Sequence, residues 1–260
     1  MSNSIQELLI LAEKNDAEAQ YELAEAYRTG TDVTENPSEA LRWYRAAAER
    51  GLADAQNNLG AMCLAGMGTE KNPAEAAYWY LKAAGQEQVH AQFNLGMLYL
   101  SGNGVEQSDE NAAHWLHAAA EQGDLEAIFQ LGNLYQLGRG VEQNYVAAAE
   151  LHTIAAIEGH PGAIDKLAEY WEEIEAAALQ GSTGAALCMA KKFDYGLGTD
   201  DDAARAYAWL QWARLHGTHD DDESEMDKWE DYLNTIASEA DKARGKKLLE
   251  EMRGRADEMI

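Results

Sequence analysis

AQFNLGMLYLSGNGVEQSDENAAHWLHAAAEQG, residues 91–123, is the stretch that decides the fold. In its first half Leu95, Gly96 and Tyr99 have the spacing of one buried stripe on an amphipathic helix. Its second half, residues 112–123, carries a similar alanine- and tryptophan-rich stripe that a glycine ends. Neither short helix can bury its stripe alone. The stretch therefore predicts a helix pair that needs copies of itself on either side.

The same design recurs with a period of 36 residues along most of the chain. Each first helix carries a small residue, a leucine, a very small residue, a large residue one turn later and a terminal glycine. Each second helix carries an alanine, a tryptophan or leucine, and a further alanine. The first-helix positions are Ala19, Leu23, Ala24, Tyr27 and Gly30; Ala55, Leu59, Gly60, Cys63 and Gly66; Ala91, Leu95, Gly96, Tyr99 and Gly102; and Ala127, Leu131, Gly132, Tyr135 and Gly138. The second-helix positions are Ala40, Trp43 and Ala47; Ala76, Trp79 and Ala83; Ala112, Trp115 and Ala119; and Ala148, Leu151 and Ala155.

Each repeated residue type has a physical reason. A glycine or alanine after the leucine lets the backbone of the second helix approach closely, and the aromatic residues fill the wider space between neighbouring pairs. A glycine at the end of a helix suits the left-handed conformation that other residues resist. The dipeptides Asn36-Pro37 and Asn72-Pro73 predict second-helix starts, because asparagine is a good N-cap and proline fits the first helical position.

The pattern A-x-x-x-L-G-x-x-Y-x-x-G…A-x-x-W-x-x-x-A-A-x-x-G resembles the Sel-1-like repeat, a relative of the tetratricopeptide repeat, over roughly residues 16–217. The resemblance implies an all-α fold, a right-handed α-solenoid of antiparallel helix pairs in which the first helix of each pair lines the concave side. It also implies a protein-interaction scaffold and not an enzyme.

The pattern divides the chain into a repeat solenoid over residues 1–217 and C-terminal capping helices over 218–260. Residues 1–14 are expected to form an N-terminal capping helix, because their apolar run is too short for a signal-peptide core or a membrane span. We expect repeats near 17–52, 53–88, 89–124 and 125–160, a shortened repeat over 161–182 and a last repeat over 183–217.

The 36-residue repeat pattern is interrupted in the fifth repeat. Leu167 and Trp171 keep the first-helix pattern, but no glycine loop follows, and the repeat ends early at Gly181. Either its turn is compressed or its two helices are joined. We favour a fused or kinked helix from Asp165 to Gln180, which would bend the solenoid.

The net charge of −26 argues against nucleic acids and anionic membranes as partners. The charge could steer a basic protein partner or could serve only to keep the chain in solution, and both interpretations stay open. Several repeats separate Cys63 from Cys188, so we expect buried, reduced thiols and no disulfide. Together these features predict a soluble, cytoplasmic protein.

No motif predicts catalysis, a cofactor or a metal site. Glycine loops such as GNGVEQ lack the preceding strand and the lysine of a phosphate-binding loop. His114 and His117 lie three residues apart and His152 lies in the next repeat, but no carboxylate at fixed spacing completes a metal site, so surface histidines are predicted. The acidic runs 200–202 and 220–223 lack the central glycine of an EF-hand loop, and are predicted to be a helix N-terminal cluster and a solvated linker.

The remaining candidate site is the concave face of the first helices. By resemblance to the tetratricopeptide array, the positions two before the repeat leucine, and two and five after it, face this groove. Its apolar middle would suit an inserted helix or extended segment, although Phe93 and Phe129 could instead pack on their own second helices. The groove positions are Tyr21, Glu25 and Arg28; Asn57, Ala61 and Leu64; Phe93, Met97 and Leu100; and Phe129, Asn133 and Gln136.

The sequence therefore favours a non-enzymatic scaffold that binds a protein or peptide, possibly a basic one, in the concave groove. The alternative is an immunity or antitoxin-like protein that neutralises a basic toxin or effector, since Sel-1-like repeats occur in immunity proteins. The oligomeric state stays open.

Overall fold

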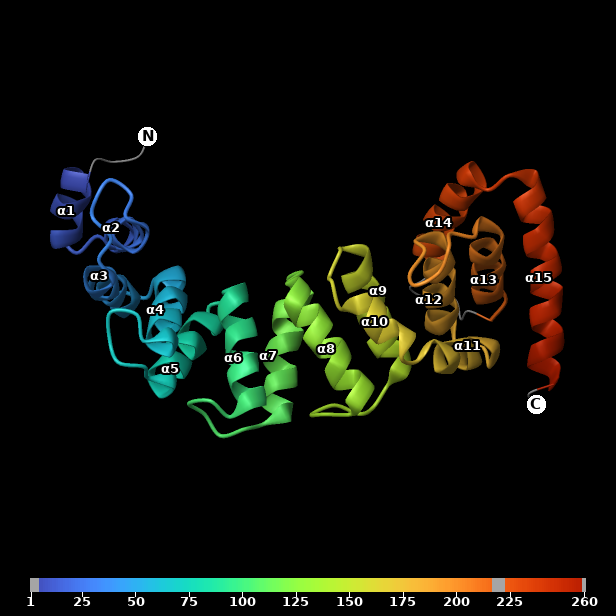
Figure 1. Cartoon of the computed structure of the whole chain (residues 1–260), viewed down its shortest axis with the longest axis horizontal. Helices are drawn as coiled ribbons and strands as arrows, with labels where there is room; N and C mark the ends of the chain where they lie inside the picture. The colour runs from blue at the N-terminus through green and yellow to red at the C-terminus, as the bar shows by residue number, and fades with distance from the viewer. Residues whose placement is uncertain (1–4, 217–222, 259–260) are drawn as a thin grey trace. The chain divides into compact units, whose positions relative to one another are not determined.

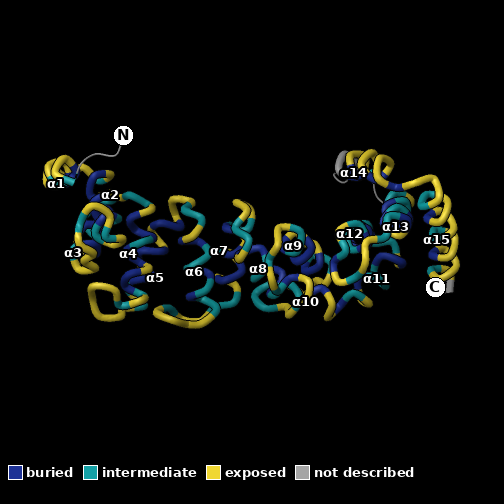
Figure 2. The backbone as a smooth tube through the Cα atoms, turned by 45° about the horizontal axis from the view of Figure 1, so that its top comes forward, coloured by how far each residue is buried: buried dark blue, intermediate teal, exposed yellow. Residues whose placement is uncertain are grey.

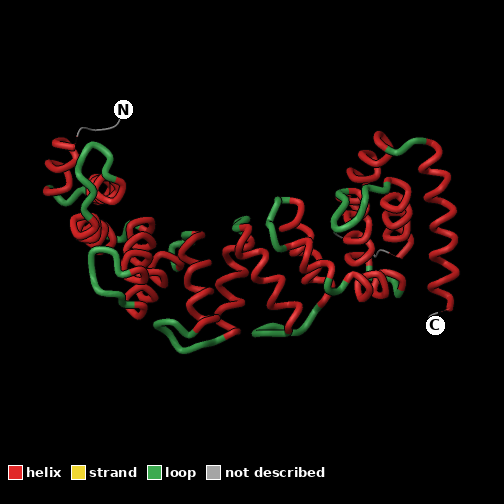
Figure 3. Tube along the Cα trace, in the orientation of Figure 1, coloured by secondary structure: helices red, strands yellow, loops and turns green. Residues whose placement is uncertain are grey.

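Helices make up all of the regular structure in the part of the chain that the computed structural model describes, residues 5–216 and 223–258 (Figures 1 and 3). This confirms the predicted all-α fold class. The chain divides into two compact units, Met1–Ala127 and Ile128–Ile260, which we call unit 1 and unit 2 and describe separately.

Unit 1 consists of an N-terminal helix and three helix pairs. In each pair an A helix packs on the B helix that follows it, and the B helices of the first two pairs pack on the A helix of the next pair. The first helix packs on the first A helix, where a preceding B helix would otherwise lie. The helices are α1 (Ile5–Glu13), the A helices α2 (Ala17–Thr29), α4 (Ala53–Ala65) and α6 (Val89–Ser101), and the B helices α3 (Pro37–Glu49), α5 (Pro73–Ala84) and α7 (Asp109–Glu121).

The helix ends follow the sequence signals. Gly30 and Gly66 end their A helices at φ of +73° and +76°, and the N–H of each donates to a carbonyl four residues back. At the start of α3 the Asn36 side chain accepts from the backbone N–H groups of Ser38 and Glu39, at 3.2 and 3.3 Å. The predicted N-caps and glycine C-caps are confirmed.

The small residue after the repeat leucine lies where the two helices of a pair approach most closely. A Cβ atom on Gly60 would lie 2.8 Å from Cε1 of Tyr80, and one on Gly96 would lie 2.8 Å from Cγ of Leu116. Both partners are buried side chains of the B helix. Figure 2 shows how buried and exposed segments alternate along these helices. The close approach that the sequence predicts is confirmed.

Buried glutamines tie each A helix of unit 1 to the end of the helix before it. The side-chain Nε2 of Gln20, Gln56 and Gln92 donates to the carbonyls of Ala12, Ala48 and Ala84, at 2.9, 3.0 and 3.5 Å. Two further glutamines, Gln86 and Gln122, donate to the Oε1 atoms of Gln56 and Gln92 at 2.8 Å. The bonds from Gln20, Gln56 and Gln92 give each of these helix-end carbonyls a second donor beside a backbone N–H.

Unit 2 begins within α8, and its later helices depart from the regular repeat. It contains one further regular pair, two short helices, a second pair and two C-terminal helices. The helices are α8 (Leu125–Leu137), α9 (Tyr145–Ile157), α10 (Ala163–Ala168), α11 (Trp171–Leu179), α12 (Thr183–Asp194), α13 (Ala203–His216), α14 (Glu223–Ile236) and α15 (Glu239–Glu258).

The single helix predicted from Asp165 to Gln180 is wrong. The chain leaves the helical conformation at Tyr170, whose φ and ψ are −145° and 23°, so α10 and α11 are separate helices joined by a compressed turn. The N–H of Tyr170 donates to the carbonyl of Leu167 at 3.2 Å, a tightened last turn. This turn directs the Tyr170 side chain into the interior of unit 2, where the residue is 2% exposed.

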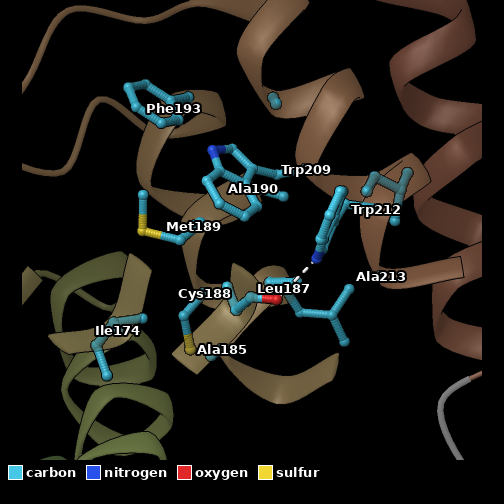
Figure 4. Close-up of a cluster of buried hydrophobic side chains, with 14 of the residues drawn as sticks. Ile174, Ala185, Leu187, Cys188, Met189, Ala190, Phe193, Trp209, Trp212 and Ala213 are labelled. Carbon is cyan, nitrogen blue, oxygen red and sulfur yellow. Dashed lines mark hydrogen bonds between the residues drawn. The ribbon is translucent and has the colours of Figure 1, made fainter. Parts of the chain in front are cut away.

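The core of unit 2 lies between α11, α12 and α13 and is closed by the C-terminal helices. In Figure 4 the Trp209 and Trp212 rings lie beside the side chains of α12, and Trp212 Nε1 donates to the carbonyl of Ala178 at 2.7 Å. Trp229 of α14 and Met252 of α15 belong to the same buried cluster. Residues 220–222 of the predicted acidic linker lie outside the described residues.

Candidate functional site

Nine of the twelve predicted groove positions lie on the A helices of unit 1, and the other three lie on α8 in unit 2. Their exposure differs. One position, Asn57, is buried, and two, Ala61 and Arg28, are exposed. The other nine are half-buried: Tyr21, Glu25, Leu64, Phe93, Met97, Leu100, Phe129, Asn133 and Gln136.

The structure brings two of the three predicted residues of α2, Glu25 and Arg28, into one polar cluster with Tyr44, and the third, Tyr21, packs its ring 5.8 Å from that of Tyr44. The carboxylate of Glu25 accepts hydrogen bonds from Tyr44 Oη and, at 2.6 Å, from Arg28. Arg28 Nε also donates to Tyr44 Oη at 3.2 Å. The hydrogen bonds from Arg28 and Tyr44 hold the pKa of Glu25 below its ordinary value although burial alone would raise it. Glu25 is therefore an anion fixed in place at the surface of α2.

A hydrogen-bonded row continues from this cluster across the next two A helices. Asn58 Nδ2 donates to Glu25 Oε1 at 2.9 Å, and Asn57 Nδ2 donates to Asn58 Oδ1 at 3.2 Å. Asn94 Nδ2 on α6 donates to Asn57 Oδ1 at 3.2 Å. We call the residues Glu25, Asn58, Asn57 and Asn94 the polar row.

The sequence interpretation missed two members of this row. Asn58 and Asn94 stand one residue before the repeat leucine, where the tetratricopeptide comparison places no groove residue. Both are half-buried, whereas the predicted Asn57 is buried. Their recurrence at one repeat position was the available signal. Each amide has two donor hydrogens and two acceptor lone pairs. Asn58 Nδ2 also lies 3.5 Å from Tyr21 Oη and from Tyr44 Oη, so the half-buried amide of Asn94 is the one with capacity left to bond the main chain of a ligand.

Apolar side chains border the polar row on α4 and α6. Ala61 is exposed and Leu64 is half-buried on α4, while Phe93, Met97 and Leu100 are half-buried on α6. A methionine side chain has three rotatable bonds and adapts to the shape of a bound group. We call the polar row together with these five side chains the A-face.

The predicted residues of α8 make contacts within unit 2. Phe129 stacks on His160 with ring centroids 3.9 Å apart and also lies 5.2 Å from the ring of His152 on its own B helix. Asn133 Nδ2 donates to Gln130 at 3.4 Å, and Gln136 Nε2 donates to Glu169 at 2.9 Å. Phe129 thus packs against its own pair, the alternative that the sequence left open.

The prediction that His152 is a surface histidine is wrong. Its ring is fully buried, directly over Gly132, where a Cβ atom would lie 2.6 Å from Nε2. Nε2 contacts the carbonyl of Phe129 at 3.3 Å, and Nδ1 bonds Tyr170 Oη. In the neutral ring Nε2–H donates to the carbonyl while Nδ1 accepts from the tyrosine. Burial lowers the pKa of His152 to about 4.

The arrangement of ionisable groups does not form a metal centre in the described part of the chain. Within it, no three histidine, cysteine or acidic side chains cluster closely enough to hold a metal ion. His114 and His117 are exposed, and His117 Nδ1 lies 3.7 Å from Glu121. Cys63 and Cys188 are buried and unpaired, as predicted. None of the described helices combines the length and apolar character needed to cross a bilayer.

The repeats match a known family. The family model described as Sel1 repeat matches residues 17–52, 53–87, 89–124, 125–160 and 189–216. No protein of curated function matches the chain.

Solved structures show the same repeat architecture. A protective antigen of uropathogenic Escherichia coli, with an SLR fold, is 26% identical at a TM-score of 0.64, over 98% of this chain and 56% of that one. The chain thus spans only about half of that protein. A Sel1 repeat protein from Oxalobacter formigenes is 30% identical at a TM-score of 0.57, over 82% of this chain and 79% of that one.

An immunity protein from Pseudomonas aeruginosa is 22% identical over 81% of this chain and 72% of its own, at a TM-score of 0.40. A match at that level supports no functional argument.

Proposed function

We propose that the chain, which belongs to the Sel1 repeat family, is a non-catalytic scaffold that binds a protein or peptide partner on the A-face of unit 1. The observation that carries the proposal is the polar row, which crosses three successive A helices and ends in a fixed carboxylate. A row of amides beside apolar side chains offers hydrogen bonds to a partner's main chain and burial to its apolar side chains.

The charge of the third repeat supports a basic partner. No lysine or arginine occurs between Lys82 and Arg139, whereas Glu106, Asp109 and Asp124 lie within that stretch. A basic segment approaching α6 and α7 would therefore meet a net negative charge, which raises the association rate at low salt.

Site-specific photo-crosslinking tests the proposal. A benzophenone amino acid is placed at Ala61, which is exposed on the A-face, and in a matched protein at Tyr78, which is exposed on B helix α5. Crosslinking in the native cell followed by mass spectrometry should give one adduct that forms from position 61 and not from position 78. Equal yields from both positions, or adducts from position 78 alone, would contradict the proposal.

Neutralisation of a basic toxin or effector is the second candidate function, and the net charge of −26 favours it. Salt separates the two functions. A partner held mainly by charge should lose affinity steeply between 50 and 500 mM salt, whereas a partner held mainly by the A-face should lose less, because salt slows only its association. We place either function in the cytoplasm, where the two buried thiols would stay reduced.

A further inference from the structure

A pocket of about 320 Å³ lies in unit 2, where the C-terminal helix α15 covers α11, α12 and α13. Apolar side chains form its floor, among them Met189 and Phe193 of α12, Trp209 of α13 and Met252 of α15. All four are buried core residues. A volume of this size is at the lower end for ligand sites and suits a group no larger than one amino acid.

Three cations line the pocket in a chain that is otherwise strongly acidic. They are Lys192 of α12, Arg205 of α13 and Arg255 of α15. Lys192 Nζ lies 5.6 Å and Arg205 Cζ 5.1 Å from the centre of the Phe193 ring, so both cations border the apolar floor. Only two acidic side chains, Glu175 and Glu251, line the same pocket.

Two of the cations already have carboxylate partners, and Lys192 does not. Arg205 pairs with Asp202 at 3.4 Å, and Arg255 pairs with Glu175 at 2.7 Å. In the described part of the chain Lys192 forms no ion pair, and its ammonium lies over the Trp171 ring, with Nζ 4.5 Å from the ring centre. Burial, followed by the nearby Arg205, lowers the pKa of the Lys192 ammonium against the opposing effect of Glu175. A half-buried ammonium without an anion is the group that a bound anion would stabilise.

We propose that this pocket binds a carboxylate on an apolar body of amino-acid size, with the carboxylate at Lys192 and the body against Met189, Trp209 and Met252. Such a group occurs in a free organic acid and at the C-terminal residue of a peptide. This site is separate from the A-face and does not depend on the function proposed for that surface.

Methionine methyl resonances report the binding directly. The full chain is labelled with [¹³C-methyl]methionine and titrated with N-acetylphenylalanine, then with the neutral N-acetylphenylalaninamide. The acid should shift the Met189 and Met252 methyls and leave that of Met62, buried in unit 1, unchanged. The amide should bind at least about tenfold more weakly, because it lacks the charge-assisted contact. Equal shifts from acid and amide, or none from the acid, would overturn the proposal.

Substitutions assign the carboxylate to Lys192. Lys192→Met should weaken binding of the acid at least about tenfold. Lys191→Gln is the matched control, because Lys191 is the preceding residue of α12 and its ammonium lies over Trp229, 5.9 Å from the ring centre. Unchanged affinity in Lys192→Met would refute the assignment. Thermal melts verify that each variant folds, and Lys192→Gln replaces the methionine variant if that one does not.

The tripeptide Ala-Ala-Phe, as free acid and as amide, identifies the source of the ligand. Tighter binding of the free-acid tripeptide than of N-acetylphenylalanine assigns the pocket to a peptide C-terminus, and weaker binding assigns it to a free organic acid. Binding of the amidated tripeptide as tight as that of its free acid would again contradict the proposal.

Discussion

Two helix pairs, one in each unit, bury a different side chain at the same position of the repeat. In unit 1 the ring of Tyr80 lies over Gly60, and in unit 2 the ring of His152 lies over Gly132. Both rings are buried, but the histidine needs hydrogen-bond partners on both nitrogens, which Tyr170 and the carbonyl of Phe129 supply. The repeat therefore determines how closely the two helices of a pair approach each other. The B-helix side chain that lies over the glycine determines which polar groups must surround it.

The glutamine position shows the same contrast. Gln56 of unit 1 bonds both the end of the preceding B helix and Gln86, which lies just after the following B helix. The equivalent residue of α8, two repeats after Gln56, is Ile128, which is buried and has no polar side-chain group. Unit 1 thus joins its pairs by buried hydrogen bonds, whereas the residue at that position of α8 has no polar side-chain group that could form one.

The largest effect is expected where the helices approach most closely. Gly60→Val should lower the free energy of unfolding by about 3 kcal/mol, because its Cβ would meet the Tyr80 ring at 2.8 Å and the carbonyl of Ala76 at 3.2 Å. Gly254→Val is the control, since Gly254 lies in a helix with nothing within 4 Å, and it should change stability by less than about 0.5 kcal/mol. Urea denaturation measures both. Equal losses of stability in the two variants would show that the close approach of Tyr80 is not the reason why a larger side chain destabilises the protein at position 60.

The stability of the helix pair that contains His152 should depend on pH. The folded pKa of about 4 lies below the ordinary 6.5, so the unfolded chain takes up the proton first. The stability from neutral His152 is complete above pH 6.5 and is lost as the pH falls from 6.5 towards 4. Between pH 7.5 and 5.0 this amounts to about 2 kcal/mol.

His152→Leu tests that contribution, because Leu116 already fills the equivalent position of the third repeat. The variant should be less stable at pH 7.5, since Tyr170 loses its partner, but its stability should fall less between pH 7.5 and 5.0 than that of the original chain. Parallel losses in the two proteins would show that His152 does not carry the pH dependence.

The smallest effect concerns the buried glutamines. Gln56→Ile should cost about 1–2 kcal/mol, because it removes two hydrogen bonds, the one from Gln56 to the carbonyl of Ala48 and the one from Gln86 to Gln56. Gln20→Ile is the internal comparison. Gln20 donates to Ala12, but its Oε1 has no partner in the described residues, so only one bond is lost. A larger loss of stability in Gln20→Ile than in Gln56→Ile would contradict the interpretation that Gln56 contributes two hydrogen bonds and Gln20 one.

The fold follows from the sequence to the extent that it depends on repeated local signals. Leucine, glycine and asparagine at fixed spacing predict the helix pairs, their caps and their close approach, because each acts through a contact inside one pair. The break at Tyr170 was not predictable in this way. No glycine or proline marks it, and what stabilises it is the burial of Tyr170 against His152, a contact between two repeats.

The candidate site was predictable in part for the same reason. A comparison by repeat position finds Glu25 and Arg28, which meet in one cluster, and the apolar side chains of α6. It misses Asn58 and Asn94, because the hydrogen bonds that align them run between neighbouring A helices. It also misses the pocket at Lys192, which exists only because α15 packs over the preceding helices.

Hydrogen exchange with the partner that crosslinks to position 61 tests the central proposal most directly. Mass spectrometry would follow the amides of the free chain and of the complex. We expect slower exchange in α2, α4 and α6 of the complex and unchanged exchange in α3 and α5. Protection confined to the B helices, or to unit 2 alone, would show that the A-face is not the binding surface.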